Sequence, residues 1–297
     1  MRSRSSSFIA LAFTSFLSAC GGSAATSDAV AVVSGAPTVA LAPAPTPAAT
    51  PAATTTSSGD TDVAAAALRR VAVALPPLNL SDMRLWNWSG RWHASEWGNG
   101  MGPLPWKYDH VSQQSAKDTY FTLDANGAPQ LQALGGTPAY TRGLWETEVT
   151  LPQLREGVIV APLWLWDGNS RDEVDFEFAG RNGLDVTLHA AVNGQMQQNT
   201  VRLFAGRDMS GQRHRFGINI DDKAGLVDMF VDGVRVHRWD RSRMAFFVSH
   251  PLKPVIEMWA ADPNNAGFVS WVGKWAGIQP GQSMRMTVHG YGYTAGQ

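Results

Sequence analysis

Three acidic residues occupy alternate positions in the segment Glu173-Val174-Asp175-Phe176-Glu177. Successive side chains of a β-strand point to opposite faces, so the three carboxyl groups would share one face and the two apolar side chains would enter a core. Like charges on one face repel one another, so a purely structural strand gains nothing from this row. The segment therefore predicts a β-strand with a functional face; the competing interpretation is a solvated acidic strand face without a chemical role.

Glycosidases need a pair of carboxyl groups beside the sugar, one as nucleophile and one as proton donor. On an extended strand the Cα atoms of Glu173 and Glu177 would lie about 13 Å apart. Inward-leaning side chains would bring the carboxyl groups within roughly 5–7 Å of each other. Retaining enzymes need about 5–5.5 Å and inverting enzymes about 6.5–9.5 Å, so the spacing alone leaves the stereochemistry open.

The rest of the second half of the chain consists of short apolar runs separated by turns, with no long helical pattern. Asp232-Gly233 between two apolar runs predicts a tight hairpin. Many strands without helices predict an all-β sandwich, and we expect residues 77–297 to form one domain, which holds all 12 tryptophans. The expected strands are 120–124, 144–151, 158–166, 173–178, 185–192, 200–204, 215–220, 226–231, 234–239, 254–259 and 283–291.

The amino terminus resembles a bacterial lipoprotein signal peptide. A basic start is followed by an apolar run at residues 8–17, which is too short to span a bilayer, and then by Leu17-Ser18-Ala19-Cys20. Cys20 is the single cysteine of the 297-residue chain and stands where a lipobox cysteine is lipidated. We expect residues 1–20 to be the signal peptide with lipidation at Cys20; the alternative is ordinary cleavage near Ala24-Ala25.

Residues 21–76 are rich in Ala, Pro and Thr and show no amphipathic period, which predicts a disordered tether. The expected protein is therefore exported and anchored by lipid to the outer membrane or cell surface, with the periplasmic face left open. A single cysteine excludes an internal disulfide in the folded domain. The net charge of −1 and the lack of a basic cluster argue against a nucleic-acid partner, and we expect a monomer.

The order of motifs resembles glycoside hydrolase family 16, most closely its lichenase-like branch. That family follows an E-x-D-x-E strand with a segment such as His214-Arg215-Phe216-Gly217 and a hairpin such as Val231-Asp232-Gly233. The resemblance extends from about Trp86 to Thr294. It implies a jelly roll of two curved antiparallel sheets with the substrate in a concave cleft.

The resemblance also implies the role of each acidic residue. Glu173 would be the nucleophile, and Glu177 would be the general acid and then the general base. Asp175 would keep Glu177 protonated, because a nearby like charge raises the pKa of a carboxyl group. The implied activity is that of a retaining endo-β-glycosidase, which cleaves internal β-linkages of a glucan or an exopolysaccharide by double displacement.

Aromatic side chains form platforms for the apolar faces of sugars, and each tryptophan of a sandwich can equally well be core. We expect Trp259 to be an exposed platform in the cleft, since it matches a tryptophan of the family's Asn-Leu-Trp strand. The full set of candidate substrate-binding residues is Asn99, Trp106, Arg142, Trp164, Trp166, His189, Glu257, Trp259 and Trp271.

The chain departs from the lichenase-like pattern at several places. It lacks their disulfide, has Glu257-Met258-Trp259 where they have Asn-Leu-Trp, and has His189-Ala190-Ala191 in place of a tyrosine-rich strand. Their calcium-binding aspartate falls near His289, so a structural calcium is unsupported and we expect neither metal nor cofactor. An intact acidic row among altered sugar contacts implies the same chemistry on a different β-linked polysaccharide.

Three other functions remain open at this point. A transglycosylase would use the same residues and exclude water as acceptor. A carbohydrate-binding, lectin-like sandwich would share the fold but would not need three aligned carboxyl groups. A surface-layer or adhesion protein would explain the lipid tether and leave the acidic strand unexplained.

Overall fold

The computed structural model describes residues 74–78, 80, 92–113, 118–133, 137–168 and 171–296. The expected signal peptide, the lipidation site Cys20 and the tether up to residue 73 lie outside the described residues. Within these ranges, no helix is long and apolar enough to cross a membrane.

The described residues form two antiparallel sheets of seven strands each, as expected for a β-sandwich. The first sheet has the spatial order β1 (His93–Ala94), β4 (Gln130–Gln132), β13 (Lys253–Ala260), β6 (Val158–Trp166), β7 (Glu173–Ala179), β8 (Leu184–Val192) and β9 (Gln195–Leu203). The second has the order β12 (Val234–Asp240), β11 (Leu226–Val231), β10 (Arg213–Asp221), β5 (Gly143–Thr150), β14 (Ser283–Thr294), β3 (Thr119–Asp124) and β2 (Val111–Gln113). The helical elements whose full bounds are described are α2 (Ala266–Val272) and the 3₁₀ turns Tyr108–His110 and Arg241–Arg243.

The alternation of the sequence determines which face of each strand is buried. In β7, Phe176 and Phe178 point between the sheets and contact Phe216 of the second sheet, with ring centroids 5.3 and 5.9 Å apart. In β6, Leu163 and Leu165 are fully buried. Each such side chain contributes about 1.5–3 kcal/mol through burial. The acidic side chains of β7 consequently point to the opposite face of the first sheet.

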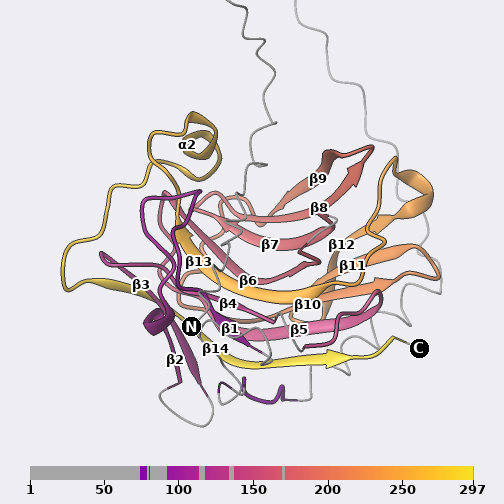
Figure 1. Ribbon diagram of the computed structural model, residues 1–297, viewed down its shortest axis with the longest axis horizontal. Coiled ribbons are helices and arrows are strands. Elements are labelled where there is room, and N and C mark those ends of the chain that lie inside the picture. Colours follow the sequence, from indigo (N-terminus) through magenta and orange to yellow (C-terminus); the bar gives the residue numbers. More distant parts are fainter. Residues whose placement is uncertain are drawn as a thin grey trace, which may run out of the picture.

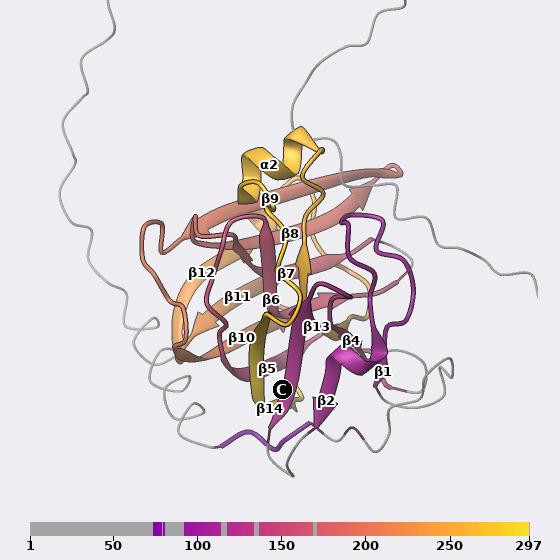
Figure 2. The same ribbon diagram turned by 90° about the vertical axis from the view of Figure 1, so that its left-hand side faces the viewer.

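That opposite face is concave. Figure 1 shows β7, β8 and β9 of the first sheet curving above β10, β5 and β14 of the second, with α2 on the far side of the first sheet from β5 and β14, and Figure 2 shows α2 in the same place after a quarter turn. The register shifts between Val160 and Leu163 in the β6–β7 pair and between Val255 and Glu257 in the β13–β6 pair. Such bulges increase bending and twist beside the site.

The expected Asp232-Gly233 hairpin is confirmed. Val231 pairs with Val234, and the two turn residues have φ angles of 52° and 76°. Positive φ at both central positions is the requirement of a type I′ turn, which glycine meets at no steric cost.

Three short strands and half of another were not predicted. β1, β2 and β4 have only two or three residues, too few to show an alternating pattern. β9 begins at Gln195 rather than at residue 200. Its first residues are exposed and polar at the edge of the sheet, so they lack the apolar alternation from which a strand is predicted. At the start of the domain the backbone N–H of Tyr291 donates to the Pro76 carbonyl at 2.9 Å. Residues just before the expected boundary at 77 therefore already pack on β14.

Candidate active site

A cavity of about 300 Å³ opens on the concave face of the first sheet. It is bounded by β4, β6, β7 and β13, by α2, and by the loop that contains Asn99. Its lining residues are Trp97, Gly98, Asn99, Gly100, Met101, Trp106, Gln130, Trp164, Glu173, Asp175, Glu177, Glu257, Trp259, Phe268 and Trp271. The three residues of the acidic row thus share one cavity with most of the candidate sugar-binding residues.

The acidic row lies along β7 and is largely shielded from water. Glu173 is 8% exposed and Asp175 is 2% exposed, while Glu177 is half-buried. On β8, His189 stands opposite Glu173 and Asp185 stands opposite Glu177. The row therefore has a titratable neighbour at each end.

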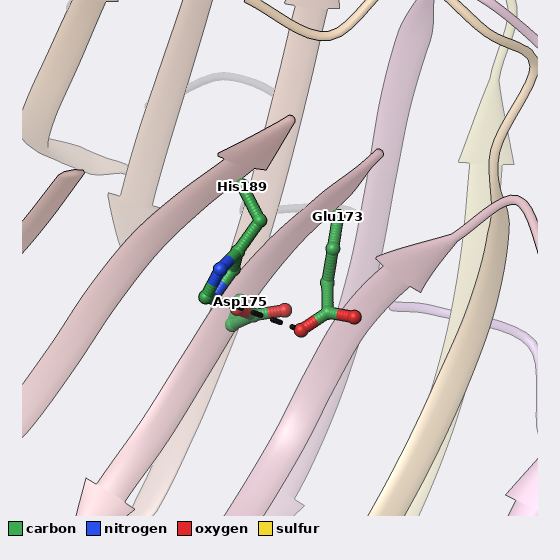
Figure 3. Close-up of side chains that lie close together, drawn as sticks. All are labelled: Glu173, Asp175 and His189. Carbon is green, nitrogen blue, oxygen red and sulfur yellow. Dashed lines mark ion pairs between the residues drawn. The ribbon is translucent and has the colours of Figure 1, made fainter. Parts of the chain in front are cut away.

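His189 lies directly beside the first two carboxyl groups (Figure 3). Its Nε2 atom is 3.1 Å from Asp175 and 3.7 Å from Glu173. Burial lowers the pKa of His189, and the charge of Glu173 acts in the opposite direction. The structure thus places His189 in contact with the acidic row, outside the cavity-lining set. The three side chains hold one ligand atom each within 4.8 Å of one another, a spacing that a metal ion could occupy.

Burial raises the pKa of all three carboxyl groups in the row well above their ordinary values. For Glu177, burial is the main cause, and Asp175 and then Glu173 add to it through charge repulsion. A carboxyl group that stays protonated near neutral pH is able to act as a proton donor. For Glu173, burial and then the charge of Asp175 raise the pKa, and the charge of His189 opposes them.

Glu257 brings a fourth carboxyl group to the cavity from β13. It is 4% exposed, and burial raises its pKa to about 7. Gln130 donates a hydrogen bond to it at 2.5 Å. The indole N–H groups of Trp164 and Trp259 approach the same carboxyl group without reaching full hydrogen-bond geometry, and all three donors moderate the rise in pKa.

Trp259 is not the exposed platform that we expected. It is only 2% exposed, belongs to the hydrophobic core and meets Phe268 edge-to-face at 5.5 Å between ring centroids. Phe268 of α2 covers it, so Trp259 contributes only a small part of its surface to the cavity. Trp106 is similarly buried, at 3% exposure. Trp164 is half-buried and retains more accessible surface.

Helix α2 forms one wall of the cavity. Asn265 caps its start by accepting hydrogen bonds from the backbone N–H groups of Gly267 and Phe268. Phe268 and Trp271 are three residues apart, so they lie on the same side of the helix, toward the cavity. The Trp271 indole donates to Asp185 at 2.7 Å, which fixes α2 to the first sheet beside Glu177.

Arg142 and Trp166 were expected in the site and do not line the cavity. Arg142 precedes β5 of the second sheet, lies 4.0 Å from Asp222 and accepts a hydrogen bond from Tyr293 through its carbonyl. Arg142 leads into the second sheet, whereas the cavity lies on the first. The sheet that a strand joins depends on long-range pairing, so the local sequence could not predict this. Trp166 lies on the same face as Trp164, with ring centroids 6.1 Å apart, but beyond the end of the cavity.

Several residues in the cavity or beside it were not predicted from the sequence. Gln130 lies on a three-residue strand without a recognisable pattern, and Asp185 gains its place only by pairing opposite Glu177. Phe268 could have been found from its spacing to Trp271. Asn99 was expected in the site and does line the cavity. Its Oδ1 accepts a hydrogen bond from the Met101 backbone N–H at 2.9 Å, and its buried Nδ2 has no hydrogen-bond partner among the described residues.

The family model of glycosyl hydrolases family 16 matches residues 98–277, which is more than half of the chain. The chain belongs to glycosyl hydrolase family 16. This span contains the whole acidic row, Glu257 and helix α2.

Curated relatives of this family 16 protein are all distant. It is 26% identical over 209 residues to a β-glucanase of Acetivibrio thermocellus, covering 66% of this chain and 57% of that protein, so it spans a little over half of the relative's length. It is 23% identical to a β-glucanase of Bacillus licheniformis, covering 79% of this chain and 90% of that protein. A xyloglucan endotransglucosylase/hydrolase of Arabidopsis thaliana is 25% identical over 54% of each chain.

Solved structures support the same fold. A Bacillus licheniformis β-glucanase aligns with a TM-score of 0.56 at 19% identity, covering 75% of this chain and 98% of the other. A native glycosidic hydrolase aligns with a TM-score of 0.57, also at 19% identity, covering 76% of this chain and 95% of the other. At this identity the likeness establishes the jelly-roll architecture.

Proposed function

We propose that this protein is a retaining endo-β-glycosidase that hydrolyses internal β-linkages of a glucan or an exopolysaccharide. The observation that carries the proposal is the row of Glu173, Asp175 and Glu177 lining one cavity, with carboxyl pKa values raised by burial. The family and the names of its β-glucanase relatives support the choice of a β-glucan as first substrate to test.

The mechanism uses the two outer carboxyl groups in turn. Glu177, kept protonated by burial and by Asp175, donates its proton to the glycosidic oxygen as that bond breaks. Ionised Glu173 attacks the anomeric carbon and forms a glycosyl-enzyme. Glu177, now deprotonated, then takes a proton from a water molecule that releases the sugar from Glu173. Asp175 and His189 stand beside Glu173 and hold it in place between these steps.

The decisive experiment analyses products from a small panel of polysaccharides. Mixed-linkage β-glucan, laminarin and xyloglucan are incubated with the protein, and new reducing ends are followed by NMR. We expect internal cleavage with the β-configuration kept at the new anomeric carbon. An inverted product would rule out Glu173 as nucleophile.

A transglycosylase is the second candidate, favoured by the xyloglucan endotransglucosylase/hydrolase among the relatives. It would give glycan products longer than the starting oligosaccharide when a labelled acceptor sugar is supplied. Tight binding without any cleavage or transfer would indicate the lectin-like alternative.

We further propose that the enzyme is exported and held at the bacterial outer membrane or cell surface by a lipid on Cys20. Stable anchoring needs more than one acyl chain, and a lipobox cysteine can carry several. Fatty-acid labelling and partition into detergent should occur in the native protein and disappear in Cys20→Ser. An unlabelled, detergent-independent native protein would leave ordinary secretion as the explanation.

A further inference from the structure

Glu257 is a carboxyl group in the cleft for which the proposed mechanism has no use. It lies on β13, where it pairs with Gln130 of β4 and Ala161 of β6. Strand β6 separates it from the acidic row on β7, yet its side chain lines the same cavity. Its negative charge contributes to raising the pKa of Glu173 and Glu177, so its field reaches the reacting groups.

The surroundings of Glu257 are built to accommodate a carboxylate. Gln130 donates to its Oε2 atom through Nε2 at 2.5 Å. The amide of Gln130 is itself oriented, because its carbonyl oxygen accepts hydrogen bonds from Ser95 at 2.5 Å and from Gln132. Together with the two indole N–H groups, the donors that the described part of the chain places at Glu257 are neutral, and none of them is a cation. Neutral donors support the anion but leave its charge uncompensated.

The charges that line this cleft are all of one sign. Among its described lining residues, four carry carboxyl groups and none is lysine or arginine. In a partly enclosed site, where the effective dielectric constant is below that of bulk water, repulsion between like charges is stronger than in solution. A polysaccharide with carboxylate or sulfate groups would have to bring its charges against Glu257, whereas an uncharged sugar offers hydroxyl groups that donate to it.

We infer that Glu257 is a specificity-determining residue, whose carboxylate accepts a hydrogen bond from a hydroxyl group of the bound sugar and whose charge excludes β-glycans with anionic substituents. This inference rests on the proposed function, because it names the substrate class of the same cleft.

Discrimination against anionic glycans depends on the ionisation of Glu257 and therefore on pH. Among the described residues, the three carboxyl groups of β7 interact with its charge, and His189 of β8 lies one strand further. Strands β4 and β6 face it with Gln130 and Trp164, which do not titrate. With a pKa of about 7, Glu257 gains its charge as the pH rises through neutrality. Discrimination should rise over the same interval.

The experiment compares mixed-linkage β-glucan with the same polymer after carboxymethylation. For the wild-type enzyme we expect kcat/KM on the carboxymethylated polymer to be at least about tenfold lower at about pH 8, a difference of about 1.4 kcal/mol. The difference should shrink at about pH 6 and at high salt, because both conditions weaken the repulsion. Glu257→Gln should remove most of the difference and its pH dependence.

Two further variants separate specificity from folding. Glu257→Asp keeps the charge and withdraws the carboxylate, so it should still exclude the anionic polymer while losing kcat/KM on the uncharged one. Glu148→Gln, on the second sheet outside the cavity, is the matched control. It should leave the ratio of kcat/KM between the uncharged and the carboxymethylated polymer unchanged at both pH values. Equal discrimination by wild type and Glu257→Gln, or equal cleavage of both polymers by wild type, would overturn the inference.

Failure of the proposed function gives a different result, because then wild type cleaves neither polymer. Binding of the two polymers, measured by calorimetry, then decides the inference. Preference for the uncharged polymer that is lost in Glu257→Gln supports it, and equal binding of both polymers or of neither contradicts it.

Discussion

The second sheet and the cleft of the first sheet both carry acidic residues on outward faces, but these two groups of carboxyl groups are neutralised differently. On the second sheet, Glu146 makes two hydrogen bonds of 3.0 Å with Arg215, and Asp228 makes bonds of 2.6 and 2.9 Å with Arg238. On the first sheet, the carboxyl groups of the cleft face one another, and His189 is the only potential cation that the described residues place in contact with the row.

The direction of these acidic side chains follows from their neighbours. Thr147 donates a hydrogen bond to the Pro162 carbonyl of β6 at 3.0 Å, so it points toward the first sheet. Glu146, the preceding residue of the same strand, must therefore point outward. Its pairing with Arg215 crosses from β5 to β10 and stabilises the sheet without any contact with the cleft.

The difference between the two faces separates structural charges from functional ones. An acidic residue that serves only the fold is paired with arginine, which supplies a planar set of donors that matches a carboxylate. Among the described residues, no arginine pairs with the carboxyl groups of the cleft, and the burial of these groups destabilises their ionised forms. A fold retains such an arrangement where raised pKa values are needed for chemistry.

The largest expected effect contrasts one acidic residue from each face. Glu173→Gln removes the proposed nucleophile and should lower kcat by about a thousandfold or more, with thermal stability unchanged or raised. Glu146→Gln leaves Arg215, which is 7% exposed, without its counter-charge. It should lower the free energy of unfolding by about 1–3 kcal/mol and leave kcat unchanged. Kinetics and thermal melting measured on both variants give the comparison.

Two results would break this contrast. If Glu173→Gln kept more than about a tenth of the activity, Glu173 would not be the nucleophile. A loss of activity in folded Glu146→Gln would show that the outer face affects the cleft. Added azide should restore turnover to Glu173→Ala and release a glycosyl azide with the inverted configuration.

The next effect concerns Trp259, which lies at the boundary between cleft and core. Because it is 2% exposed and packs against Phe268, Trp259→Ala should lower the free energy of unfolding by about 3–5 kcal/mol. Trp164→Ala, at a half-buried position in the same cleft, should lower stability less and substrate affinity more. Denaturant unfolding and oligosaccharide binding are the measurements. Equal loss of stability in the two variants would contradict this distinction.

A smaller effect is the pH dependence of stability. Glu257 has a pKa of about 7 in the folded protein against an ordinary value of 4.5, so between these values the folded state binds more protons than the unfolded state. The stabilisation is fully present below about pH 4.5 and is lost as the pH rises through 7, by linkage. The lost free energy is about 3 kcal/mol at most.

Glu257→Gln should therefore flatten the decline of the melting temperature between about pH 5 and pH 8. Asp228→Asn, on the outer face, is the control, since it leaves the buried carboxyl groups of the cleft in place. A wild-type melting temperature that rises steadily over this interval would show that these groups do not dominate the pH dependence.

The smallest expected effect lies in the pH profile of catalysis. Burial and then the charge of Asp175 raise the pKa of Glu177, so the high-pH limb of activity should report the loss of its proton. Asp175→Asn removes one source of repulsion and lowers the pKa of Glu177. The high-pH limb of kcat/KM should then move to lower pH. A high-pH limb that stays in place would show that Asp175 does not raise the pKa of Glu177.

The sequence by itself determined the elements that depend on neighbouring residues. The alternation in Glu173-Val174-Asp175-Phe176-Glu177 predicts both the strand β7 and the common face of its carboxyl groups, because side-chain direction in a strand repeats every second residue. The Asp232-Gly233 turn is local for the same reason, since two adjacent positive φ angles suffice to make it. The sandwich followed from many such short patterns.

Only the tertiary structure decided what lies against the acidic row. Glu257 is 80 positions beyond Glu177 in the chain and reaches the cleft because β13 pairs with β6, which in turn pairs with β7. Trp259 is buried because Phe268 of α2 covers it, and Arg142 is excluded because its segment enters the other sheet. Strand periodicity fixes the face on which a residue lies, whereas strand order and packing decide what that face meets.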